Sequence, residues 1–169
     1  MFPKPVQSLT PNTFDYEQKP LVKQTGFREY DARWLFGPEL NLMGVQALGM
    51  GLGALLRELG VAPDIVVGHD YRSYSSSIKL ALVTGLMAAG VRVRDIGLAL
   101  SPMAYFAQFD LDAPAVAMVT WPGLAFMASI RSLALLYGAF GLTPITWMLA
   151  TLRNRCQSVM RAFSEPSVS

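Results

Sequence analysis

The sequence predicts an α/β fold: a three-layer α/β/α domain with a mostly parallel sheet, followed by an apolar, helical C-terminal tail. Between residues 27 and 120, short apolar runs alternate with longer segments of helical spacing. Strands separated by helices of this length form parallel βαβ units, with the helices covering the sheet. Hydrophobic residues make up 52% of the chain and charged residues 15%, which excludes a disordered chain because there is enough apolar material for a core.

The first expected element is residues 27–36, a partly alternating, aromatic-rich run that can pair as an edge or antiparallel strand. Gly37-Pro38 ends this run. Three helices follow, which begin and end at serine, proline or glycine signals, and we expect them near residues 39–59, 76–89 and 102–109. Three buried strands alternate with these helices, and we expect them to be adjacent and parallel, at residues 64–68, 91–96 and 115–119.

The first long helix contains four glycines, Gly44, Gly49, Gly51 and Gly53. Each lowers helix propensity by roughly 1 kcal/mol relative to alanine, so their presence indicates close packing against a neighbouring helix or sheet. Residues 49–53 also look like a glycine-rich nucleotide loop. They lack its spacing and lie inside a helical pattern, so we interpret them as a packing surface.

The composition changes near residue 120. Residues 1–120 have a net charge of −1 and residues 121–169 a net charge of +3, and no Asp or Glu occurs from Ala113 to Ser164. Ordinary usage predicts about six acidic residues in a stretch of that length. We therefore divide the chain into a flexible leader at 1–26, an α/β domain at 27–120 and a divergent apolar and basic tail at 121–169.

The tail contains 21 consecutive uncharged residues, from Ser132 to Leu152, and about 20 apolar residues suffice to span a bilayer. Arg153, Arg155 and Arg161 would then favour a cytoplasmic C-terminal side. Thr143-Pro144 interrupts the run, however, which favours a helical hairpin that packs on the sheet. Membrane association is thus the weaker of the two alternatives.

Several classes of protein are excluded or unsupported. One Cys and one His rule out an intramolecular disulfide and any His/Cys zinc site within one chain. A net charge of +2 gives no support for nucleic-acid binding. The N-terminal residues lack the apolar core of a signal peptide, so we expect a cytoplasmic location.

Chemistry is expected at the carboxyl ends of the strands, where ligands bind to open α/β sheets. Arg28, Arg33 and Arg72 could together clamp a phosphate there, although each alone is typical of a solvated or salt-bridged surface residue. His69 beside Asp70 could be a base held by a carboxylate, or a polar loop residue that closes the strand.

Four segments in order resemble motifs of the α-D-phosphohexomutases, the phosphomannomutase/phosphoglucomutase group. FREYDAR at 27–33 resembles the FRxYDIRG opening of that family, and GHDYRSYS at 68–75 resembles its GRDGRxS loop. The segment at 90–102 resembles its G-x-x-V-x-D-x-G…TP pattern, and AVAMVT at 115–120 resembles the strand before its TASHNP loop. The resemblance covers about residues 27–120 and extends to the first domain, domain I, only.

The resemblance implies an isomerase of four domains that moves a phosphoryl group between the C1 and C6 hydroxyls of a hexose phosphate. The reaction uses a phosphoserine, a bisphosphorylated intermediate and Mg²⁺. By this resemblance Tyr30 and Arg33 border the active site, and Arg33 orients and neutralises the transferring phosphoryl group. Arg28 and Arg72 are weaker candidates for phosphate binding.

The chain departs from the family pattern at several positions. His69 stands where the family usually has Arg, and Tyr71 where it usually has Gly. Trp121 and Pro122 follow Thr120, so Pro122 occupies the position of the phosphoserine and has no hydroxyl. The acidic metal loop of the family is also missing, so no metal ligand is assigned here.

We therefore expect a truncated relative of the mutases that is inactive alone and self-associates through exposed apolar surface. The alternative is a non-catalytic α/β module whose apolar tail binds a membrane or a partner. The residues leave the preference for mannose or glucose phosphate open, as well as the origin of the tail, whether frameshift, insertion or gene-model error.

Overall fold

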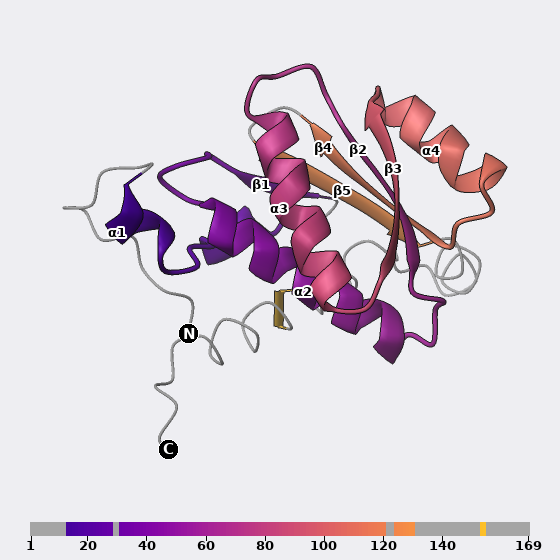
Figure 1. The fold of residues 1–169 in the computed structure, drawn as a ribbon, viewed down its shortest axis with the longest axis horizontal. Helices are drawn as coiled ribbons and strands as arrows, with labels where there is room; N and C mark the ends of the chain where they lie inside the picture. The colour runs from indigo at the N-terminus through magenta and orange to yellow at the C-terminus, as the bar shows by residue number, and fades with distance from the viewer. Residues whose placement is uncertain (1–12, 29–30, 121–123, 131–152, 155–169) are drawn as a thin grey trace.

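The computed structural model describes residues 13–28, 31–120, 124–130 and 153–154 (Figure 1). The helices are α1 (Phe14–Glu17), the 3₁₀ turn η1 (Gln24–Gly26), α2 (Leu42–Glu58), α3 (Ser75–Ala88) and α4 (Ser101–Asp110). The strands are β1 (Ala32–Trp34), β2 (Asp64–His69), β3 (Arg92–Leu98), β4 (Ala115–Thr120) and β5 (Leu124–Ile130). The expected alternation of strands and helices is thus confirmed between residues 32 and 120.

The strands form one five-stranded sheet in the order β1-β5-β4-β2-β3. Strands β3, β2 and β4 are parallel, as predicted, with Ile65 of β2 opposite Val93 on one side and Ala115 on the other. Strands β5 and β1 are antiparallel to their neighbours. Crossover helices are required between parallel strands, and α3 and α4 supply them.

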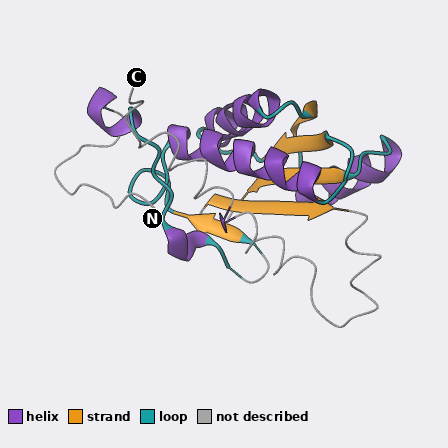
Figure 2. Ribbon diagram, turned by 90° about the horizontal axis from the view of Figure 1, so that it is seen from below, coloured by secondary structure: helices purple, strands orange, loops and turns teal. Residues whose placement is uncertain are grey.

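Helices cover both faces of this sheet (Figures 1 and 2). On one face Ile65, Val67 and Val119 pack with the buried side chains of α2 and α3 in the larger core cluster. On the other face Val66, Val116 and Met118 pack with Ala104 of α4. Successive residues of a strand point to opposite faces, so β2 and β4 contribute to both cores.

Glycines allow the backbones of α2 and α3 to contact each other directly where the two helices cross. A Cβ atom at Gly49 would lie 3.0 Å from the backbone nitrogen of Leu86, and one at Gly85 would lie 2.9 Å from the carbonyl carbon of Gln46. Gly53 similarly faces Ala89 and Val91. The close packing that the glycines of α2 predict is therefore present, and it is directed mainly against α3.

Residues 13–26 differ from the flexible leader that the sequence suggested. Leu21 and Val22 are buried at 6% and 0% exposure, and Val22 belongs to the larger core cluster. The segment is held by Asn41, which is fully buried. Its side-chain oxygen accepts hydrogen bonds from the backbone nitrogens of Leu21 (2.9 Å) and Gly44 (2.8 Å). Its amide donates to the carbonyl oxygens of Tyr16 (3.0 Å) and Lys19 (2.7 Å).

We predict that Asn41→Ala lowers the free energy of unfolding by about 2 kcal/mol, because it removes the N-cap of α2 and leaves buried backbone groups unpaired. Asn41→Asp keeps both acceptor bonds but places a buried carboxylate oxygen against the carbonyl oxygens of Tyr16 and Lys19, so it should also destabilise the fold at neutral pH. Denaturant titration followed by circular dichroism measures both variants. An unchanged midpoint for Asn41→Ala would contradict a structural role for residues 13–26.

The strand expected at 27–36 is shorter than predicted. The backbone nitrogen of Arg28 donates to the carbonyl oxygen of Asp31 (2.8 Å), and the strand itself comprises only Ala32–Trp34. Trp34 is 1% exposed, donates to the carbonyl oxygen of Lys23 (2.6 Å) and packs edge-on against Phe27. The strand does lie at an edge and pair antiparallel, as predicted.

The prediction of a helical tail is wrong for residues 124–130. They form β5, which pairs with β4 from Thr120↔Ala125 to Ala115↔Ile130. Strand β4 is buried and pairs with β2 on one side only, so the backbone N–H and C=O groups on its other side need a hydrogen-bonding partner. Pairing with β4 therefore outweighs the local helix propensity of residues 124–130. Residues 132–152, where the hairpin or membrane segment was expected, lie outside the described part. No helix among the described residues is long and apolar enough to cross a bilayer.

Candidate functional site

The candidate site lies at the sheet edge where β2, β3 and β4 end, at His69, Leu98 and Thr120. The three strands are parallel, so their carboxyl ends meet there, and the loops that follow them share one rim. The backbone links these loops: Asp70 nitrogen donates to Val119 oxygen (3.0 Å) and Ala99 nitrogen donates to His69 oxygen (2.9 Å).

Arg33 lies on β1, early in the chain, and the pairing of the strands places it at this same edge of the sheet. Arg33 pairs with Ala125 of β5, and Ala125 pairs with Thr120 of β4, so the three residues form one row across the sheet. Two strand spacings separate Arg33 from Thr120, about 10 Å. Ala32 and Trp34 point into the larger core cluster, so Arg33 projects from the opposite face. Thr120 follows Val119, which also belongs to that cluster, and therefore shares the face of Arg33.

Arg33 is held by a buried carboxylate. Its Nε donates to Oδ2 of Asp31 at 2.6 Å, and the side chains of Arg33 and Asp31 are 43% and 12% exposed. A guanidinium has five N–H donors, so this bond fixes the side chain while most donors remain. Asp31 was not selected from the sequence. The available signal was that Asp31 lies two residues before Arg33 in the run at 27–36, which was expected to be a strand.

The other candidates from the same motif are less defined. Arg28 is exposed, and its backbone nitrogen donates to the carbonyl oxygen of Asp31 just before β1. Tyr30 lies outside the described residues, as does Pro122. The stretch that contains Pro122 connects β4 to β5, so it begins next to Thr120 at the same sheet edge as Arg33.

Asp70 organises the loop after β2. It is 5% exposed, accepts a hydrogen bond from Ser75 Oγ (2.5 Å) and accepts another from the backbone nitrogen of Arg72 (3.2 Å). It also forms an ion pair with the guanidinium of Arg72. That guanidinium carbon lies 5.1 Å from the ring centre of Tyr71, which is 78% exposed. Arg72 is therefore a partnered side chain at the rim of the site.

His69 forms no hydrogen bond with Asp70 in the described part of the chain, so the base-carboxylate pair considered from the sequence is not formed there. Its Nδ1 is buried and has no hydrogen-bond partner in the described part. A nearby ion pair joins Lys79 Nζ to Asp95 Oδ2 (2.5 Å), with Lys79 6% exposed. Burial raises the pKa of Asp95, but hydrogen bonds from Lys79 and the backbone nitrogen of Gly97 outweigh it, so the pKa lies below its ordinary value.

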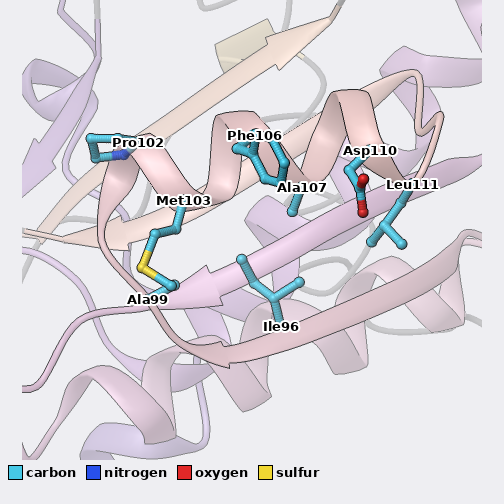
Figure 3. A pocket seen from close by; sticks show the side chains of 8 residues that line it. All are labelled: Ile96, Ala99, Pro102, Met103, Phe106, Ala107, Asp110 and Leu111. Carbon is cyan, nitrogen blue, oxygen red and sulfur yellow. The ribbon is translucent and has the colours of Figure 1, made fainter.

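A separate groove lies between α4 and the edge strand β3 (Figure 3). Its lining is apolar apart from Asp110 and consists of Ile96, Ala99, Pro102, Met103, Phe106, Ala107, Asp110 and Leu111. A phosphate ester requires hydrogen-bond donors or cations, and this groove supplies a carboxylate. The groove therefore does not provide the phosphate chemistry of the candidate site.

Within the described residues, no three His, Cys, Asp or Glu side chains lie close enough together to hold a metal ion. The acidic side chains at the candidate site, Asp31 and Asp70, are each engaged by an arginine. The Mg²⁺ that the resemblance implies thus has no ligand set in this part of the chain, and no chemical step is assigned to it.

Comparison with known proteins identifies the domain. Residues 24–121 match the family described as phosphoglucomutase/phosphomannomutase, alpha/beta/alpha domain I. A phosphomannomutase of Escherichia coli is 43% identical over 91 residues, which is 54% of this chain and 19% of that protein. A phosphomannomutase sequence of Klebsiella pneumoniae is 41% identical over 91 residues, 54% of this chain and 55% of that sequence.

A solved structure agrees with these matches. A phosphoglucomutase/phosphomannomutase family protein from Burkholderia thailandensis superimposes with a TM-score of 0.66 and 25% identity, over 82% of this chain and 31% of that one. The chain spans about a fifth of the length of the E. coli relative. The family match ends at residue 121, next to the composition change near residue 120.

Proposed function

This chain belongs to the phosphoglucomutase/phosphomannomutase family through its α/β/α domain I, and we propose that it keeps the phosphate-binding edge of a hexose-phosphate mutase without the transfer step. The observation that carries the proposal is the row Arg33–Ala125–Thr120. In this row the Arg33 side chain shares a sheet face with Thr120, the last residue before the segment in which the family resemblance puts the phosphoserine.

The chemistry of the row supports this assignment. Phosphoryl transfer depends on positioning and on stabilising charge more than on covalent help from the protein, so a fixed arginine near the transfer point is the expected component. The donor differs, because Pro122 at the phosphoserine position has no hydroxyl to phosphorylate. The proposed ligand is a hexose phosphate, the substrate class that the family resemblance implies, and the proposed location is the cytoplasm.

A binding measurement tests this proposal. Isothermal titration of the full chain with glucose 1-phosphate and mannose 1-phosphate should give a saturable signal. Arg33→Ala should weaken binding by about tenfold or more, because hydrogen bonds to a charged group are lost. Arg92→Ala is the matched control: Arg92 is exposed at the start of β3, the opposite end of the strand from the candidate site. Equal effects of the two variants, or no binding by the wild-type chain, would refute the proposal.

We also propose that the isolated chain self-associates. Six large hydrophobic side chains on and around α4 are between 37% and 70% exposed: Leu98, Leu100, Met103, Phe106, Phe109 and Leu111. Monomeric proteins rarely expose continuous apolar patches beyond a few hundred Å², so this face favours association.

Sedimentation velocity measures this prediction over a range of concentrations. The wild-type chain should shift to larger species as its concentration rises, and Phe106→Ser with Phe109→Ser should restore the monomer. Phe14→Ser is the control, because Phe14 is 82% exposed on α1, which lies at the opposite side of the fold from α4 (Figure 1). A monodisperse wild-type monomer at high concentration, without detergent, would contradict the expectation.

A further inference from the structure

We propose that the exposed ring of Tyr71 is a stacking platform for the sugar ring of the hexose phosphate, and thereby a specificity-determining residue of the candidate site. This inference rests on the proposed function and adds a residue with a role that arginine cannot supply. Tyr71 is 78% exposed, two residues after the carboxyl end of β2. An aromatic ring with one free face at this edge is suited to contact the apolar C–H face of a pyranose.

The guanidinium of Arg72 lies over one face of the Tyr71 ring. Arg72 stacks on it with its guanidinium carbon 5.1 Å from the ring centre, and the carboxylate of Asp70 fixes that guanidinium. Asp70 in turn is buried and accepts a hydrogen bond from the hydroxyl of Ser75 (2.5 Å). A surface tyrosine normally loses conformational freedom when it binds a ligand, and this chain of contacts removes part of that cost in advance.

The platform and the phosphate site lie on one rim. The nitrogen of Asp70 donates to the oxygen of Val119, so the Tyr71 loop adjoins the end of β4, and Arg33 lies two strands beyond β4. Three strand spacings, about 14 Å between backbones, separate the two residues. An arginine side chain, a tyrosine side chain and a hexose phosphate between them are together long enough to span this distance. A hexose phosphate whose phosphate is held at Arg33 can therefore reach Tyr71 with its sugar.

The chemistry favours a sugar over inorganic phosphate at Tyr71. A phenol ring offers an apolar face and one hydroxyl, whereas a phosphate needs cations or several donors. The nearby guanidinium of Arg72 is already paired with Asp70. Tyr71 should therefore add affinity for the hexose part of the ligand and leave the affinity for the phosphate part unchanged.

The experiment compares two probes on the full chain, glucose 1-phosphate and inorganic phosphate, by isothermal titration. Tyr71→Ala should weaken glucose 1-phosphate binding by about three- to tenfold, the range that an aromatic contact supplies, and leave inorganic phosphate binding unchanged. Tyr71→Phe keeps the ring and should bind as the wild type does. Phe106→Ala, which removes a ring that is 70% exposed on α4, is the matched control.

Saturation-transfer NMR supplies a readout that a purely structural role would not change. Signal from the aromatic protons should reach the pyranose C–H protons in the wild type and in Tyr71→Phe, and be lost in Tyr71→Ala. If Tyr71→Ala weakens both probes equally, or neither, the platform is refuted. If Arg33→Ala abolishes glucose 1-phosphate binding while Tyr71→Ala does not alter it, only the platform fails. If the wild type binds neither probe, the proposed function fails as well.

Discussion

We expect no hexose-phosphate mutase turnover from this chain alone, with or without Mg²⁺ and a bisphosphate activator. The family reaction, as the resemblance implies, requires a phosphorylated hydroxyl directly after β4, and Pro122 at that position cannot carry one. Arg33 could stabilise developing charge, but without a donor there is no group to transfer. Enzymes accelerate reactions by at least about 10⁶-fold, so the expected effect is the loss of the whole acceleration.

Nearby hydroxyls do not replace the missing serine. Ser129 lies on β5 opposite Val116, near the start of β4. Four residues of strand separate that position from Thr120, about 13 Å along the sheet. Ser129 belongs to the tail, which was expected from the sequence to be helical. The structure assigns it to a strand instead, and its register is what removes it from the transfer point.

A coupled assay with glucose 1-phosphate and mannose 1-phosphate measures this expectation, with Arg33→Ala run in parallel. Conversion in the wild-type chain that disappears in Arg33→Ala would show that the chain is catalytic and that Pro122 does not mark the loss of the donor. Replacing residues 121–123 by Ala-Ser-His supplies a hydroxyl after Thr120. Incorporation of phosphate at that serine from a bisphosphate would show that the remaining edge is competent to bind the donor.

The parallel part of the fold could be predicted because its signals are local. Val66 and Val67 lie in a short apolar run before a polar loop, and Gly60 and Gly90 adopt positive φ where they end α2 and α3. The positions of the three helices and three strands follow from such patterns within a few residues. Arg33 at the sheet edge was likewise expected from the motif that contains it.

The remaining elements depend on contacts distant in sequence. Asn41 holds Tyr16, Lys19 and Leu21, which lie 20 to 25 residues before it, and a lone Asn before a helix predicts only the cap. Strand β5 forms because β4 needs a hydrogen-bonding partner on the side away from β2. The apolar residues at 124–130 are compatible with either a strand or a helix, so the sequence pattern alone does not predict this strand. At the site, the Asp31–Arg33 and Asp70–Ser75 contacts required the side-chain geometry.

The helix crossing gives the largest expected effect on stability. A Cβ atom at Gly85 would overlap the carbonyl oxygen of Gln46 and lie 2.9 Å from its carbonyl carbon and 3.0 Å from the backbone nitrogen of Met50. These are backbone atoms in the middle of α2, so no side-chain rotation can relieve the overlap. The helices must separate, which disturbs the core residues Leu48, Leu52 and Leu82 between them and the sheet.

Gly85→Ala should therefore lower the free energy of unfolding by about 4 kcal/mol or more, a large part of the stability of a domain of this size. The sign of this change distinguishes a close helix contact from an open position, because alanine at an unobstructed helix position stabilises by roughly 1 kcal/mol relative to glycine. Thr84→Ala at the adjacent, exposed position is the control and should change stability by less than about 0.5 kcal/mol. Thermal and denaturant unfolding followed by circular dichroism measures both. A Gly85→Ala variant at least as stable as the wild type would mean that α2 and α3 do not pack backbone to backbone.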